Sequence, residues 1–93
     1  MIQMSLSRAA TLLECGPPQT DVKFSGITSD SRRIAPGMLF AALSGETFDG
    51  HDYIKQAEEC GAAAVLVCRE VETELPVLQV DNVLTALGIL AAD

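Results

Sequence analysis

Apolar residues recur at helical spacing in three segments of the chain. In each segment they lie about three and four positions apart, as one buried face of a helix requires. Residues that can cap a helix start, or glycines that can end one, stand at the segment boundaries. The predicted helices are Ser5 to Glu14, Asp52 to Cys60, and a third that is capped by Asp81 or Asn82 and whose pattern continues to Asp93.

Short β-prone runs lie between these helices. One run alternates apolar and small polar residues, and the others are continuously apolar, as in strands buried on both faces. The predicted strands are Phe24 to Ser29, Met38 to Leu43, Ala63 to Val67, and Pro76 to Val80, with a type II turn over Ala35-Pro36-Gly37-Met38. This order of elements predicts one α/β domain over residues 1–93, with a small mixed sheet of about four to five strands flanked by three helices.

The charge balance narrows the possible partners. The 93 residues include 13 acidic and 6 basic side chains, and the net charge of -7 would repel nucleic acids and anionic lipids. The longest apolar stretch, Ala62 to Cys68, is much shorter than the roughly 20 residues of a membrane span, and the N-terminus does not resemble a signal peptide. We therefore expect a cytoplasmic protein that binds neither nucleic acid nor membrane.

The chain has 3 cysteines and 1 histidine. They form no CxxC motif and no metal-ligand spacing, so no metal site is expected. Cys60 and Cys68 lie among apolar residues, where a reduced cysteine acts as a small hydrophobe.

Three polar segments could carry chemistry. Thr28 to Arg33 spans the end of a predicted strand and the loop or strand exit after it, and offers hydroxyl and guanidinium donors for phosphate oxygens. Gly45 to Asp52 combines two glycines with a carboxylate, a hydroxyl and an aromatic ring, which together could hold a planar heterocycle. Arg69 to Glu74 is interpreted as a solvated connection.

Structural interpretations of the first two segments remain open. Asp30 with Arg32 or Arg33 can be a surface ion pair, and the glycine loop can be a tight connection only. His51 has no recognisable nucleophile partner, so helix capping by Asp49 or Asp52 is favoured over catalysis at this position. The sequence contains neither the P-loop motif nor the dinucleotide-binding glycine motif.

The same two segments, with their surroundings, resemble the N-terminal domain shared by the MurE and MurF peptidoglycan ligases of the Mur ligase family. The resemblance covers nearly the whole chain. It rests on D-S-R at Asp30 to Arg32, P-G-x-L-F-x-A-L at Pro36 to Leu43, G-E-x-x-D-G-H-x-Y at Gly45 to Tyr53, and G-A-x-A-x-L-V at Gly61 to Val67.

Two features are more similar to MurF than to MurE. The loop contains Phe48 and has Glu46-Thr47 where MurE commonly has His-Gln. The segment Leu75 to Val80 and the later Leu87-Gly88-x-Leu90-Ala91 are also MurF-like. A MurE-type ligase and a non-catalytic α/β interaction module remain the alternatives.

The resemblance implies a domain that holds the UDP end of a UDP-N-acetylmuramoyl peptide. The full-length ligase would use ATP and Mg2+ to join D-alanyl-D-alanine to a UDP-linked muramoyl tripeptide, while this chain alone would be inactive and monomeric. By position, the residues implied in binding the UDP moiety are Ser31, Arg32, Gly45, Glu46 and Thr47, with Thr28, Asp30 and Phe48 as weaker candidates.

Overall fold

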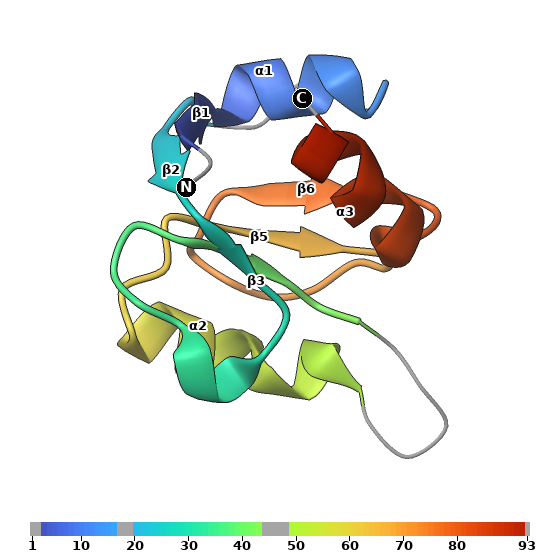
Figure 1. Cartoon of the computed structure of the whole chain (residues 1–93). Helices are drawn as coiled ribbons and strands as arrows, with labels where there is room; N and C mark the ends of the chain where they lie inside the picture. Colours follow the sequence, from blue (N-terminus) through green and yellow to red (C-terminus); the bar gives the residue numbers. More distant parts are fainter. Residues whose placement is uncertain (1–2, 17–19, 44–48, 93) are drawn as a thin grey trace.

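The computed structural model describes residues 3–16, 20–43 and 49–92, and its elements confirm the α/β class. Three α-helices and two short 3-10 helices accompany six strands (Figure 1). The helical elements are α1 (Leu6–Leu12), η1 (Ser31–Arg33), η2 (Gly50–Tyr53), α2 (Ile54–Glu59) and α3 (Val83–Ala92). The strands are β1 (Gln3–Ser5), β2 (Lys23–Ser25), β3 (Ile27–Thr28), β4 (Leu39–Ala41), β5 (Ala64–Val67) and β6 (Val77–Gln79).

The strands form two sheets, where the sequence predicted a single mixed one. β1 and β2 pair antiparallel, with Met4 opposite Phe24. β3, β4, β5 and β6 form a separate sheet in that order, with all three pairings parallel. The predicted strand Phe24 to Ser29 divides at Gly26, whose φ of 86° interrupts the extended backbone.

Both faces of the parallel sheet are buried. On β5, Ala64 and Leu66 belong to one hydrophobic cluster, and Val65 and Val67 belong to another, because successive side chains of a strand point to opposite faces. All four have an exposed fraction of 0%. Burial on both faces explains why this strand is continuously apolar in the sequence.

The two clusters are covered by different parts of the chain. The connections between the parallel strands contribute Ile34, α2, Val71 and Leu75 to the cluster around Val65, so these connections share one face. The helices α1 and α3 cover the opposite face and contact each other (Figure 1). The four parallel strands follow one another in the sheet in the same order as in the chain. Right-handed crossovers between strands in that order place all the connections on one face of the sheet.

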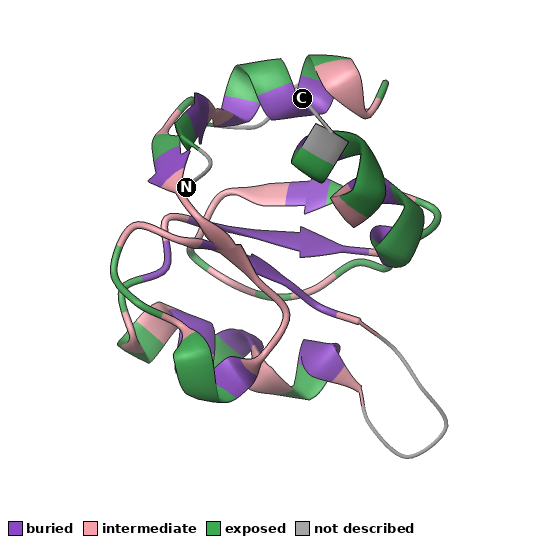
Figure 2. Cartoon of the chain, viewed as in Figure 1, coloured by how far each residue is buried: buried purple, intermediate pink, exposed green. Residues whose placement is uncertain are grey.

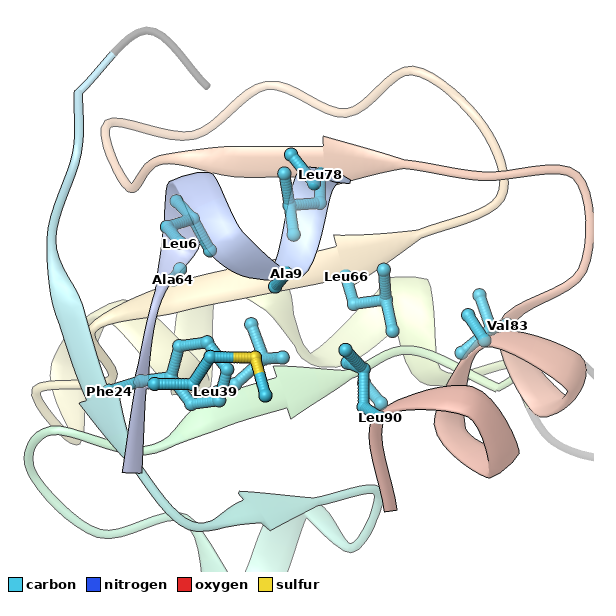
Figure 3. Packing of buried hydrophobic residues seen from close by; sticks show 13 residues of the cluster. Leu6, Ala9, Phe24, Leu39, Ala64, Leu66, Leu78, Val83 and Leu90 are labelled. Carbon is cyan, nitrogen blue, oxygen red and sulfur yellow. The ribbon is translucent and has the colours of Figure 1, made fainter. Parts of the chain in front are cut away.

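The cluster under α1 and α3 also includes the small sheet. Figure 3 shows Leu6 and Ala9 of α1, Phe24 of β2 and Leu90 of α3 converging on the strands. Figure 2 shows the central strands buried and the outer helix surfaces exposed. The antiparallel pair is therefore fixed to the domain through this core.

The boundaries of the elements differ from the predictions at several positions. α1 is shorter than predicted, although Ser5 caps it by accepting the Arg8 N–H at 3.2 Å. The predicted helix Asp52 to Cys60 is divided into η2 and α2, and Gly61 follows with a φ of 81°. Of the two proposed caps of α3, Asn82 accepts the Thr85 N–H at 3.0 Å. None of the helices within the described residues is long and apolar enough to cross a membrane.

Candidate functional site at the carboxyl edge of the sheet

The four parallel strands end at one edge of the sheet. Ligands of open α/β sheets bind outside the carboxyl ends of their strands. Thr28 ends β3 and Ser29 to Arg33 follow it, the predicted glycine loop follows β4, Cys68 and Arg69 follow β5, and Asp81 and Asn82 follow β6. Since neighbouring strands lie about 4.8 Å apart, the ends of β3 and β5 are separated by roughly 10 Å.

The exit of β3 is a tightly hydrogen-bonded turn. The Thr28 hydroxyl accepts the Asp30 N–H at 3.1 Å. The Asp30 carboxylate accepts the Arg32 N–H at 2.9 Å and so caps η1. These local contacts fix the backbone between the strand and the 3-10 helix, which the sequence had predicted as a loop or strand exit.

The Asp30 carboxylate also meets two guanidinium groups. It accepts the Arg32 Nε–H at 3.3 Å, and its second oxygen lies 3.7 Å from the Arg33 Nε. The Arg32 N–H, the Arg32 side chain and the positive charge of both arginines lower the pKa of Asp30. The Arg32 side chain is 87% exposed, so most of its surface remains accessible at this edge.

Ser31 is one of the buried polar residues of the described chain. Its carbonyl oxygen accepts a hydrogen bond of 2.7 Å from the Gln56 side chain on α2. η1 is therefore attached to α2. Gln56 was not among the predicted site residues, because a glutamine in a helical pattern gives no local signal of a contact distant in sequence.

The predicted site residues Gly45, Glu46, Thr47 and Phe48 lie outside the described residues. The backbone on both sides of this segment is described. The Gly50 N–H donates to the Leu43 carbonyl at 2.6 Å, and Asp49 caps η2 by accepting the His51 N–H at 3.0 Å. The expected capping role of Asp49 is confirmed, for the 3-10 helix that precedes α2.

His51 is buried, with 2% of its side chain exposed. Its Nδ1 lies 2.7 Å from Asp49 Oδ1, and its Nε2 lies 3.3 Å from the Cys68 backbone nitrogen. Because that nitrogen is a donor, Nε2 is the acceptor, and these contacts assign the proton of the neutral ring to Nδ1. His51 thus links the exit of β4 to the exit of β5.

Arg69 forms an ion pair with the second oxygen of Asp49. The Arg69 guanidinium and then the two hydrogen bonds from His51 hold the pKa of Asp49 well below its usual range, while Asp49 raises the pKa of Arg69. The connection from Arg69 to Glu74 was predicted to be solvated, and its four charged residues are exposed, but it also makes contacts that were not predicted. Besides this ion pair, the Thr73 hydroxyl donates to Glu58 on α2 at 2.7 Å, and Val71 packs against the core.

A pocket of about 210 Å³ lies at the same edge. It is lined by Leu43, Cys68, Asp81, Asn82, Val83 and Leu84. A larger pocket of about 530 Å³ lies beside the small sheet and includes Arg8, Lys23 and Gly37. Gly37 precedes β4, so the larger pocket is at the opposite end of the strands from the predicted site.

The structural interpretation of Cys68 is confirmed. Cys68 and Cys15 pack against the core cluster of α1 and α3, and burial raises the pKa of the Cys15 thiol. Within the described ranges the three cysteines form no disulfide. The part of the chain that the structure describes includes no group of three or more His, Cys, Asp or Glu side chains that could hold a metal ion.

Comparison with known proteins identifies the family. The model of the Mur ligase family, catalytic domain, matches residues 23–93. The chain belongs to the Mur ligase family. The UDP-N-acetylmuramoyl-tripeptide--D-alanyl-D-alanine ligase of Escherichia coli is 41% identical over 92 residues, which are 99% of this chain and 20% of that protein.

Other Mur ligases support the same assignment. The UDP-N-acetylmuramoyl-L-alanyl-D-glutamate--2,6-diaminopimelate ligase of Bacillus licheniformis is 40% identical over 91 residues, covering 95% of this chain and 19% of that ligase. A crystal structure of MurF from Acinetobacter baumannii superposes with a TM-score of 0.85 at 29% identity, covering 99% of this chain and 21% of the MurF chain. The predicted family, its fold and the resemblance to MurF are confirmed, and the chain spans about a fifth of the length of these relatives.

The structure brings together part of the predicted site. Thr28, Asp30, Ser31 and Arg32 gather at the exit of one strand of this Mur ligase domain. Arg69 lies at the same edge, two residues after the end of β5. It was not among the predicted site residues, because a run of charges is typical of a solvated surface.

Proposed function

We propose that this Mur ligase domain binds the UDP end of a UDP-N-acetylmuramoyl tripeptide. In this proposal it is a domain of a cytoplasmic, monomeric ligase that adds D-alanyl-D-alanine during synthesis of the peptidoglycan precursor. The observation that carries the proposal is the 41% identity, over 99% of the chain, to a ligase whose name specifies that substrate and that dipeptide. The cluster of donors at the carboxyl edge supports it.

The chemistry of the edge suits an anionic nucleotide. The chain has a net charge of -7, so a diphosphate needs local donors that outweigh the long-range repulsion. The Arg32 guanidinium presents one edge to Asp30 through Nε and Nη2, and Nη1 remains as a donor to a phosphate oxygen. The hydrogen bonds of Asp30 and Thr28 restrain the turn before binding, which reduces the ordering cost of binding.

In this proposal the domain binds and orients the substrate and takes no chemical step. A solved MurF structure from Thermotoga maritima is a complex with ADP. It superposes with a TM-score of 0.65 at 31% identity and covers 70% of this chain and 15% of that chain. ATP with Mg2+, bound to other parts of the ligase, would supply the phosphoryl group that activates the substrate carboxylate, with ADP as the leaving group. The described residues include no group of three or more His, Cys, Asp or Glu side chains that could hold a metal ion, and the sequence has no P-loop motif. Binding energy from the distant nucleotide would act by positioning the peptide carboxylate.

Calorimetry on the purified 93-residue chain tests the proposal. We expect weak binding of UDP and of UDP-N-acetylmuramoyl tripeptide, and no specific binding of Mg-ATP. Backbone NMR shifts on adding UDP should include Ser31 and Arg32. If neither uridine compound binds, a module without a nucleotide ligand is favoured. Specific binding of ATP would contradict the assignment of UDP binding to this domain and of ATP binding to other parts of the ligase.

A diaminopimelate-adding ligase is the second candidate, because a relative with that activity in its name is 40% identical. The two candidates differ in the amine that the full-length ligase accepts. Product formation with D-alanyl-D-alanine and the tripeptide substrate supports the first candidate. Product formation only with 2,6-diaminopimelate and the shorter substrate supports the second.

A further inference from the structure

Contacts from separate elements join the two sides of the segment 44–48. The first is a backbone closure, in which the Gly50 N–H donates to the Leu43 carbonyl at 2.6 Å. A Cβ at position 50 would lie 2.7 Å from the Leu43 nitrogen and 2.8 Å from the Ala42 Cα. Only glycine therefore permits this approach without a backbone shift.

The second set of contacts consists of side chains. Asp49 receives two hydrogen bonds from His51 through one oxygen and an ion pair from Arg69 through the other. His51 in turn accepts the Cys68 N–H at 3.3 Å. Asp49, His51 and Arg69, called here the loop anchor, thus connect the chain after β4 to the end of β5.

Burial and hydrogen bonding restrain the side chains of the loop anchor. Its histidine is almost completely buried and both ring nitrogens have partners, so rotation of the ring would leave buried polar atoms unsatisfied. Its carboxylate is held in the charged form by a guanidinium and by N–H donors. The buried histidine, added to the more exposed ion pair of Asp49 and Arg69, fixes the neighbouring backbone more strongly than that ion pair alone would.

We propose that Asp49, His51 and Arg69 are positioning residues for the nucleotide-binding edge. They fix the exits of β4 and β5 at the edge where Ser31 and Arg32 follow the neighbouring strand β3, and thereby reduce the cost of ordering this edge when the UDP-linked substrate binds. This inference rests on the proposed function and extends it to residues that would not touch the reacting atoms. Their loss should weaken substrate binding and leave the chemical step intact.

Steady-state kinetics of the full-length ligase test the loop anchor. We expect His51→Ala to raise the KM for the UDP-linked substrate about tenfold or more, with kcat and the KM for ATP changed less than about twofold. His51→Gln should recover part of the loss, because its amide oxygen can accept the Cys68 N–H. Arg69→Gln removes the ion pair at an exposed site and should raise the same KM even if the His51 variants fold poorly.

Thr73→Ala is the matched control. Thr73 lies on the same connection as Arg69 and bonds to Glu58 at 2.7 Å, on α2 and outside the loop anchor. This variant should lower the melting temperature without changing either KM. If Arg69→Gln and a folded His51 variant keep the wild-type KM, or if Thr73→Ala raises it equally, the inference is wrong. An inactive wild-type ligase with both amine substrates would instead refute the proposed function.

Discussion

Gly50 illustrates how a single residue can be required by close backbone packing. Replacing it with alanine places a Cβ 2.7 Å from the Leu43 nitrogen, which belongs to backbone and cannot rotate away. We expect Gly50→Ala to destabilise the chain by about 1–3 kcal/mol, the usual cost of forcing extra volume into a packed site. Urea denaturation measures the difference, and an unchanged midpoint would contradict the close approach.

Asp49 should make the stability of the protein depend on acid pH. Its pKa is lowered in the folded state by Arg69 and His51, so its contribution is present above the ordinary carboxyl pKa of about 4 and is lost as the pH falls below that value. We expect Asp49→Asn to melt at a lower temperature than the wild type at neutral pH. Melting curves measured across the acid range should converge below about pH 4. Curves that remain parallel would show that Asp49 has the same pKa in both states.

Some residue roles could be predicted from sequence and others could not. Asp49 was expected to cap a helix, because an aspartate before a helical pattern has a local partner in the next N–H groups. The contacts of His51 with Cys68 and of Ser31 with Gln56 join residues far apart in the chain. No local pattern carries such information, so these contacts appear only once the sheet is assembled.

At the scale of elements, α3 offers a test of helix propensity. Gly88 lies within this helix, is exposed, and a Cβ built on it meets nothing within 4 Å. Gly88→Ala should therefore stabilise the protein by roughly 0.5–1 kcal/mol, because alanine loses less backbone entropy in a helix. Gly61→Ala is the contrasting variant, since the φ of 81° at Gly61 makes alanine destabilising there. Equal effects of the two substitutions in urea denaturation would refute this account.

Long apolar patterns predicted elements better than short ones. β5 and α3 were found because their apolar residues form unbroken buried surfaces. β1 was missed, since three residues with one buried side chain are too few to show a period. The η1 turn and the first two residues of η2 were also missed as helix, because their hydrogen bonds depend on local caps and not on an apolar face.

At the scale of the whole molecule, two hydrophobic clusters pack against opposite faces of one parallel sheet. Leu66 is completely buried on the face under α1 and α3, while Tyr53, the only tyrosine in a chain without tryptophan, packs against the other face. Leu66→Ala should cost about 2–5 kcal/mol. We expect the fluorescence of Tyr53 and far-UV circular dichroism to show the same lowered urea midpoint, as in cooperative unfolding.

Leu84→Ala is the control for this prediction, because Leu84 is 67% exposed and its loss should change stability by less than about 0.5 kcal/mol. Separate midpoints for the two signals in Leu66→Ala would mean that the two faces unfold independently.

The order of the strands has a kinetic consequence. Each parallel strand pairs with its neighbour in the chain, so every step of sheet growth closes only one connection and loses little loop entropy. The contact between α1 and α3 joins distant parts of the chain and is expected to form last. A substitution in the buried face of α3, such as Ala86→Gly, should then accelerate unfolding in stopped-flow measurements and leave the folding rate almost unchanged. A slowed folding rate would instead put the docking of the two helices in the transition state, and the final closure of the domain would be its rate-limiting event.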